Sequence, residues 1–289
     1  MAWVYLNGDF VAPERALVAA DDEGLLYGRG LFETFRARNG VVYRLDKHLE
    51  RLAEGAALLG IPVPSPLKEL AQAVGELAER CALPDTRVRL TLTAGPARGE
   101  PTVLMQARAV VEYPESLYER GMSAVVVSVR RNETSPLART KSLSYLDNLL
   151  ARAEARRAGA DEALFLNTRG LLAEGSATNL FVVRQGELLT PPIEDGALPG
   201  VTRGSVMELA LGAGIAVHEA SLTLEDLRVA DEAFLTNAVM GVMPLVAVDG
   251  APLADGRLGP LSGRLRLLYE AVANAAPTYS MTGSERGHH

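Results

Sequence analysis

The sequence predicts a two-domain protein of mixed α+β and α/β structure, on three observations. Its 289 residues exceed the roughly 100–200 residues of one typical domain. The first third gives short apolar runs separated by turns and then two helix-length periodic segments. The remainder alternates strand-like with helix-like segments. We expect a smaller α+β domain at 1–115, a connection at 116–121, a larger domain at 122–280 and a disordered tail at 281–289.

The first domain is expected to begin as a hairpin-rich sheet. Asn39 and Gly40 give a turn signal between two apolar runs, which is typical of a β-hairpin. In the first of two following helices, Leu45, Leu49 and Leu52 recur at helical spacing and mark one buried stripe. The expected strands are 3–8, 31–37, 41–45, 87–94 and 102–111, and the expected helices are 45–59 and 66–82.

The second domain is expected to follow EYPESLYERG (112–121), whose proline and charges suggest a connection. The run SAVVVSVRR (123–131) is typical of a buried strand that opens this domain. The further expected strands are 162–167, 178–183, 232–236 and 242–248, and the expected helices are 146–158 and 201–213.

Composition and charge argue against several classes of partner. No run approaches the roughly 18–20 apolar residues that a membrane helix needs, and the start lacks the pattern of a secretory signal. We therefore expect a cytoplasmic protein without a membrane partner. A net charge of −7 argues against a surface that binds the phosphate backbone of nucleic acid.

Histidine and cysteine are too scarce for several common catalytic centres. Cys81 is the only cysteine, so an internal disulfide or a cysteine-rich metal site is excluded. The four histidines are His48, His218, His288 and His289, and the last two lie in the predicted tail. His48 and His218 are each more typical of structural positions than of a hydrolytic triad or a zinc site. We expect no metal.

Lysine is the residue type that the composition singles out. Only three of the 29 basic residues are lysines, and one of them is Lys141. Arginine cannot lose its proton near neutral pH, whereas a partly desolvated lysine can, and only a neutral amine attacks a carbonyl to form a Schiff base. The stretch TSPLARTKSLSY (134–145) holds no acidic residue that would keep this amine charged. Taken alone, Lys141 could equally be a surface lysine in a loop.

Six segments that occur in a fixed order place Lys141 in a wider pattern. They are YGRGLFETFR (27–36), LDKHLERL (45–52), KSLSYLDNLLAR (141–152), GADEALFLNTRGLLAEGSATNLF (159–181), LPGVTR (198–203) and ADEAFLTNAVMGVMPL (230–245). Together they resemble the class IV aminotransferases, the fold-type IV pyridoxal-phosphate enzymes. This family includes branched-chain and D-amino acid aminotransferases and 4-amino-4-deoxychorismate lyases. The resemblance covers nearly the whole chain and implies a fold like that of the D-amino acid aminotransferases.

The resemblance implies a role for each of several residues around pyridoxal 5′-phosphate. Lys141 would form the Schiff base with the cofactor and then move the proton at the substrate Cα, as an amine held beside that bond can. Glu174 would face the pyridine nitrogen and keep it protonated, which makes the ring an electron sink. Arg51 would bind the phosphate, and Tyr145 would lie near the phenolic oxygen. Glu174 as an ordinary turn residue and Arg51 on a solvated helix face are the alternatives.

The phosphate and the substrate need further partners. Free backbone N–H groups at the start of the helix expected at 201–213 favour an anion. The cofactor-binding candidates there and nearby are Asn179, Val201, Thr202, Asn237 and Ala238. Ala238 departs from the family, which often carries a hydroxyl residue at that position, so one side-chain contact with phosphate is missing or replaced by backbone.

Three residues are candidates for binding the substrate. Glu33 is a pocket candidate, and Arg29 and Arg98 are predicted to bind carboxylate because each lies beside a glycine in a turn. Arg98 falls where D-amino acid enzymes place such an arginine, although Glu100 stands where their partner histidine would be. Solvated loop arginines are the alternative for both positions.

The resemblance leaves the reaction open. TNAVMGVMPL (236–245) and LTAGPARG (92–99) look like the lyase branch, and no Y-x-R element stands where the branched-chain enzymes carry theirs. Transamination is the commoner activity in the family. We expect a homodimeric transaminase that moves an amino group between a small amino acid, D-amino acids included, or a primary amine and a 2-keto acid. 4-Amino-4-deoxychorismate lyase is the alternative, and branched-chain aminotransferase ranks below both. Because Lys141, Glu174 and Arg51 are all present, a binding protein that has lost the chemistry is disfavoured.

Overall fold

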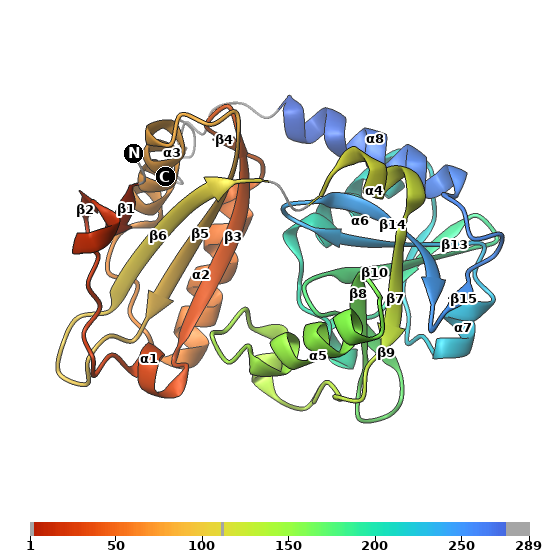
Figure 1. Ribbon diagram of the computed structural model, residues 1–289, viewed down its shortest axis with the longest axis horizontal. Helices are drawn as coiled ribbons and strands as arrows, with labels where there is room; N and C mark the ends of the chain where they lie inside the picture. Colours follow the sequence, from red (N-terminus) through yellow and green to blue (C-terminus); the bar gives the residue numbers. More distant parts are fainter. Residues whose placement is uncertain (1–2, 111–112, 276–289) are drawn as a thin grey trace, which may run out of the picture. The chain divides into compact units, whose positions relative to one another are not determined.

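Figure 1 shows the computed structural model, which describes residues 3–110 and 113–275. The contact pattern divides the chain into two compact units: one formed by the chain up to Val110 together with the residues from Ala273 onward, and one that lies between them and ends at Val272. The tail expected at 281–289 lies outside the described residues. Over the two described ranges, no helix combines the length and the apolar character needed to cross a bilayer.

The first unit is an antiparallel sheet covered by two long helices, with strand order β2-β1-β6-β5-β3-β4. Leu49, Leu52 and Leu77 of the helices share one buried core with Phe35 and Leu90 of the sheet. Burying each such side chain stabilises the fold by about 1.5–3 kcal/mol. The elements are β1 (Val4–Leu6), β2 (Asp9–Val11), α1 (Glu23–Tyr27), β3 (Gly30–Arg38), β4 (Val41–Val42), α2 (Leu45–Leu59), α3 (Leu67–Arg80), β5 (Asp85–Thr93) and β6 (Thr102–Ala109).

Helix α2 begins and ends where its sequence periodicity predicts. Arg44, with φ 55°, takes a left-handed conformation that turns the chain into the helix. Gly60, with φ 62°, closes the helix by donating its N–H to the carbonyls of Ala56 and Ala57. Glycine adopts this conformation without steric cost, which is why the helix stops there. The buried stripe of α2 contains His48 beside its leucines.

The second unit is built on a larger mixed sheet of order β12-β11-β10-β13-β14-β7-β8-β9. Strand β7 runs parallel to both β8 and β14, whereas β9 returns antiparallel to β8. The strands are β7 (Met122–Val126), β8 (Glu162–Leu166), β9 (Leu172–Gly175), β10 (Asn179–Arg184), β11 (Glu187–Thr190), β12 (Val217–Glu219), β13 (Glu232–Asn237), β14 (Gly241–Val248) and β15 (Ala251–Pro252). The helices are α4 (Glu115–Arg120), α5 (Leu146–Arg157), α6 (Val201–Gly212), α7 (Leu224–Arg228) and α8 (Pro260–Asn274).

The segment predicted as a connection, 116–121, forms most of helix α4 instead. Pro114 occupies the position before the first turn, where a missing N–H costs nothing. Leu117 and Tyr118 are buried in the core of the second unit, and the Tyr118 hydroxyl donates to the Met240 carbonyl at 2.7 Å. The charged residues of the segment belong to an amphipathic helix, which proline and charge alone do not distinguish from a linker.

Candidate active site

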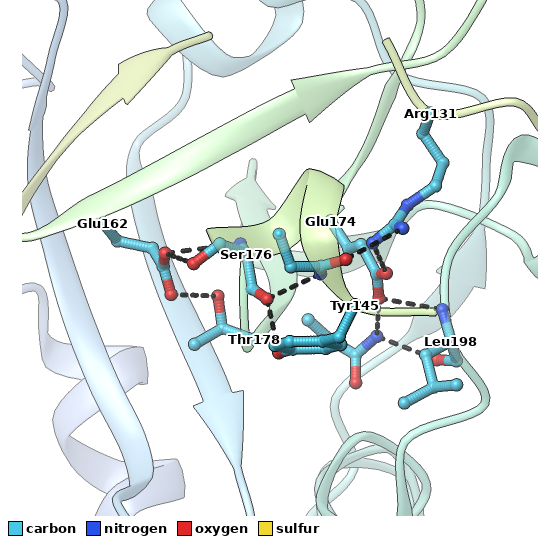
Figure 2. Close-up of polar contacts among 9 residues, drawn as sticks. Arg131, Tyr145, Glu162, Glu174, Ser176, Thr178 and Leu198 are labelled. Carbon is cyan, nitrogen blue, oxygen red and sulfur yellow. Dashed lines mark hydrogen bonds and ion pairs between the residues drawn. The ribbon is translucent and has the colours of Figure 1, made fainter. Parts of the chain in front are cut away.

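Glu174 lies at the centre of a buried polar cluster in the second unit (Figure 2). It is placed by β9, which is paired along β8 through Leu164 and Gly175. One carboxylate oxygen accepts from Nη2 of Arg131 at 2.5 Å, and the other accepts from the Leu198 N–H at 2.8 Å. The Asn179 amide donates to that second oxygen at 3.5 Å. Both carboxylate oxygens are therefore held in place although the side chain is removed from water.

Burial and charge act in opposite directions on this carboxyl group. Burial is the largest influence and raises the pKa of Glu174, while Arg131, the Leu198 N–H and Lys141 oppose it. The pKa of Glu174 remains above its ordinary value. The charges of Arg131 and Lys141 and the Leu198 N–H are therefore the contacts that favour the anionic form of Glu174, the form that a protonated ring nitrogen needs beside it.

Lys141 lies in the short segment between a 3₁₀ turn, Pro136–Arg139, and helix α5. The turn begins at Ser135, whose hydroxyl accepts from the Leu137 N–H, and Thr140 returns to an extended conformation. Lys141 is half-buried, and its positive charge acts on Glu174. The structure therefore brings these two predicted residues into one electrostatic site.

Tyr145 and Asn148 converge on a single backbone carbonyl. The Tyr145 hydroxyl donates to the Ser176 carbonyl at 2.8 Å, and the Asn148 amide donates to the same oxygen at 2.7 Å. Burial, followed by the charge of Glu174, raises the pKa of Tyr145 to about 12. Tyr145 is consequently a neutral phenol with a fixed direction at physiological pH.

The loop that follows Glu174 is fixed by a second buried carboxylate, Glu162 (Figure 2). Glu162 accepts from the Ser176 hydroxyl and, at 3.2 Å, from the Thr178 hydroxyl. A Cβ at Gly175 would lie 2.0 Å from the Thr178 hydroxyl oxygen, so this close approach requires glycine. Glu162 thereby fixes the carbonyl that orients Tyr145.

The start of helix α6 has the features of an anion site. Its N-cap is Gly200, which supplies no side-chain cap, and the first turn contains no acidic residue. A Cβ at Gly200 would lie 2.0 Å from the Asn179 amide oxygen, so only glycine fits there. On β13, against which α6 packs, the buried Thr236 hydroxyl has no hydrogen-bond partner among the described residues. Open N–H groups of the helix and an unused hydroxyl together suit a phosphate.

The remaining predicted contacts are distributed around the same strands. Val201 opens helix α6, and the Thr202 hydroxyl lies 3.4 Å from that of Tyr269. The Asn237 side chain accepts from the N–H groups of Val239 and Met240, both at 2.9 Å. Ala238 lies inside this turn and has no hydroxyl, so only its backbone groups could contact a phosphate.

The residues of the second unit fit pyridoxal 5′-phosphate. A buried carboxylate is present for the ring nitrogen, a lysine for the aldehyde, and a helix start with an unused hydroxyl for the phosphate. No group of three or more histidine, cysteine, aspartate or glutamate side chains could hold a metal ion within the part of the chain that is described.

Glu33, His48 and Arg51 form a separate buried cluster in the first unit. Arg51 donates to both oxygens of Glu33, through Nε at 2.8 Å and Nη2 at 2.7 Å. Nδ1 of His48 lies 2.7 Å from Oε2 of Glu33. Burial alone would raise the pKa of Glu33, but the charge of Arg51 and the contacts with His48 outweigh it and bring the pKa to about 2. Glu33 is thus a permanent anion that orients Arg51.

This cluster should make the stability of the protein depend on acid pH. Because the pKa of Glu33 falls from 4.5 to about 2 on folding, its contribution is complete above pH 4.5 and is lost as pH falls through about 2. We expect Glu33→Gln to remove about 3 kcal/mol of this pH-dependent stability. Urea unfolding of wild type and variant between pH 7 and 2.5 measures it. Glu50→Gln, at an exposed carboxylate of α2, should leave the pH dependence unchanged. Parallel curves for wild type and Glu33→Gln would contradict the assignment.

Arg29 and Arg98 lie in different environments within the first unit. Arg29 is paired with Glu23 at 2.6 Å and donates to the carbonyls of Leu59 and Gly60. Arg98 is exposed in the loop between β5 and β6. Binding of a substrate carboxylate by either residue stays a prediction.

Sequence reasoning missed several residues of these clusters, among them Arg131, Asn148, Ser176 and Thr236. Arg131 ends the run expected as a buried strand and gave no signal of its own, because its partner Glu174 is 43 residues away. His48 did carry a signal, since it lies three residues before Arg51 on one face of α2. That spacing predicts that His48 and Arg51 are neighbours on the helix, but not that Glu33 of β3 lies between them.

Comparisons with known proteins find similar chains over nearly the whole length of this one. The chain is 39% identical over 278 residues to a putative branched-chain-amino-acid aminotransferase of Methanocaldococcus jannaschii, covering 93% of this chain and 96% of the relative. It is 32% identical over 277 residues to the aminodeoxychorismate lyase of Bacillus subtilis, covering 92% and 93%. A solved branched-chain aminotransferase of Thermoproteus uzoniensis superposes with a TM-score of 0.88, at 36% identity, covering 95% of this chain and 96% of that one.

The family itself is shown by a match that spans most of the chain. Residues 30–248 match the amino-transferase class IV family, and this range contains Lys141, Glu174 and the start of α6. The fold agrees with that match, and the structural neighbours include an aminotransferase with pyridoxamine 5′-phosphate. The chain therefore belongs to the class IV aminotransferases, enzymes that use pyridoxal 5′-phosphate.

Proposed function

We propose that this enzyme is a transaminase that moves an amino group between a small amino acid and a 2-keto acid, with Lys141 as its covalent cofactor ligand. The observation that carries the proposal is the electrostatic site of Glu174, in which a buried carboxylate and a lysine act on each other. The reactions of class IV aminotransferases need a carboxylate for the ring nitrogen of pyridoxal phosphate and a lysine for its aldehyde.

The described side chains support the following division of work. Bound pyridoxal phosphate supplies an electron sink for the negative charge left at the substrate Cα. Lys141 would remove the proton from the substrate Cα and pass it to the cofactor carbon that is bonded to the transferred nitrogen. Glu174 would lie beside the ring nitrogen, and Tyr145 presents a neutral hydroxyl whose direction is set by its hydrogen bond to the Ser176 carbonyl. The start of α6 and Thr236 would bind the phosphate.

The donor class that the relatives favour is the branched-chain amino acids. The Methanocaldococcus relative and the superposed Thermoproteus enzyme are both named for that activity. These relatives favour the branched-chain reaction more strongly than the sequence motifs did, where it ranked below the other two reactions. Donor assays with leucine, isoleucine and valine against 2-oxoglutarate should give the highest kcat/KM, compared with D-alanine and a primary amine. A preference for D-alanine or the amine would reject the branched-chain assignment.

Aminodeoxychorismate lyase is the second candidate, because the Bacillus subtilis relative matches nearly the full chain and the segments 236–245 and 92–99 look like that branch. Both activities begin with removal of the Cα proton. A transaminase then returns a proton to the cofactor carbon and releases a keto acid, whereas the lyase releases pyruvate and forms an aromatic ring. Release of pyruvate and 4-aminobenzoate from aminodeoxychorismate, at a rate above that of any transamination, would select the lyase.

We also propose that the enzyme works as a homodimer in the cytoplasm. Helix α5 exposes three leucines along one face, Leu146, Leu149 and Leu150, with exposed fractions of 66%, 53% and 50%. Near the start of the chain, Leu25 and Tyr27 are 68% and 75% exposed. Exposed apolar residues in such groups are typical of an interface. A second copy is the occupant that the family resemblance implies, with segment 27–32 reaching the partner's pocket.

Leu149→Asp should therefore weaken the dimer, because it places a charge in the apolar face of α5. Sedimentation velocity at assay concentration should show a shift from dimer to monomer together with a loss of activity. Leu211→Asp is the matched control, since Leu211 is 60% exposed on a different helix, α6. A wild-type enzyme that is monomeric and fully active would rule out a required dimer.

A further inference from the structure

Arg131 is a cation of the second unit's polar cluster that sequence reasoning did not assign. From the contacts below we infer that Arg131 is a positioning residue: it fixes the direction of the Glu174 carboxylate and favours its ionised form, and so acts through Glu174 on the ring nitrogen of the cofactor. This inference rests on the proposed function, because it assigns Arg131 a role in the same site.

The structure fixes the arginine on several sides. Its backbone N–H donates to the Leu166 carbonyl at 2.9 Å, which ties the residue to the end of β8. The guanidinium lies over the Phe165 ring, 4.6 Å from its centroid. A Cβ at Gly196 would lie 2.8 Å from Cγ of Arg131, so the loop backbone closes on the arginine's stem. Its Nη1 donates to the Asn148 side chain at 3.4 Å. These contacts therefore hold the positive charge of Arg131 in one position relative to Glu174.

The guanidinium of Arg131 does not use all of its hydrogen-bond donors. Nε of Arg131 is buried and has no hydrogen-bond partner among the described residues. A buried donor without a partner disfavours the folded state. The arrangement nevertheless aims Nη2 at one oxygen of Glu174 and leaves the other oxygen to the Leu198 N–H. The two contacts together orient the Glu174 carboxylate.

Arg131 also differs chemically from the other cation that acts on Glu174. Lys141 must lose its proton to act as a base, so its charge varies during turnover. A guanidinium keeps its charge throughout. Arg131 is thus a permanent counter-charge that opposes the rise in pKa which burial imposes on Glu174. A carboxylate kept anionic leaves the shared proton on the ring nitrogen, where it is needed.

The test is a double-mutant cycle on the holoenzyme. Arg131→Met keeps the length of the stem without the charge, Arg131→Lys keeps the charge without the planar fork, and each is made in wild type and in Glu174→Gln. Single-turnover rates are measured with the donor identified in the assays above, with hydrogen or deuterium at Cα. Affinity for pyridoxal 5′-phosphate is measured separately by absorbance titration of the apoprotein.

We expect Arg131→Met to slow Cα deprotonation by about a hundredfold, which corresponds to a change of about two pKa units at the shared proton. The effect should fall on kcat more than on KM, with a larger deuterium isotope effect and weaker binding of the cofactor. Arg131→Lys should be intermediate. In the Glu174→Gln background, neither substitution should slow the reaction further, because Arg131 acts through that carboxylate.

Two results would overturn the inference: wild-type rates in Arg131→Met, or the same fold loss with and without the Glu174 carboxylate. Thermal unfolding checks each variant, and if Arg131→Met does not fold, the cycle with Arg131→Lys decides by the same criterion. Failure of the proposed function looks different, since the wild-type protein itself would then show no transamination with any donor.

Discussion

Replacing Lys141 by alanine is expected to abolish covalent attachment of the cofactor and to reduce turnover by about 10⁴-fold or more. The substitution removes both the amine that binds the cofactor and the base that moves the Cα proton. The half-buried position of Lys141 in a loop means that the fold should survive. Borohydride reduction followed by peptide mass mapping measures the attachment, and single-turnover kinetics measure the rate.

The other two lysines provide the controls for this experiment. Lys47 is exposed and paired with Glu50 on the surface of α2, and Lys68 lies on α3. Alanine at either position should leave attachment and turnover at wild-type levels. Recovery of the reduced cofactor on Lys47 or Lys68 in the wild-type enzyme would show that Lys141 has been assigned wrongly.

Replacing Glu174 by glutamine is expected to leave cofactor binding measurable but to slow Cα deprotonation by about a hundredfold or more. A neutral amide cannot stabilise a protonated ring nitrogen, so the negative charge at Cα loses its sink. Arg131 would also be left beside a neutral partner. Stopped-flow absorbance after mixing with the amino donor measures the step directly.

Glu174→Asp tests whether the effect is one of charge or of shape. It keeps the carboxylate but shortens the reach, so it should fall between wild type and Glu174→Gln. Near-normal deprotonation in Glu174→Gln would mean that another group maintains the ring nitrogen's proton, or that the proton is not required.

Helix α2 shows how much local structure can be predicted from sequence. Its leucines recur at helical spacing, and the structure places Leu45, Leu49 and Leu52 in the core as that spacing predicts. The same reasoning failed for 116–121, which forms most of helix α4. An amphipathic helix of 6 residues is too short for periodicity to stand out, so tertiary burial of Leu117 and Tyr118 decides its structure.

The sequence by itself determined the family and the cofactor that the family uses. Lys141 stands out in a chain that otherwise uses arginine, and six ordered segments resemble the class IV aminotransferases that the comparisons then showed. Only the tertiary structure decided which groups surround Glu174. Its ion pair with Arg131 depends on how β7, β8 and β9 pair, because 43 residues separate the two side chains. Periodicity and motifs report the chain's local preferences, whereas a buried charge finds its partner through strand pairing, which is a property of the whole sheet.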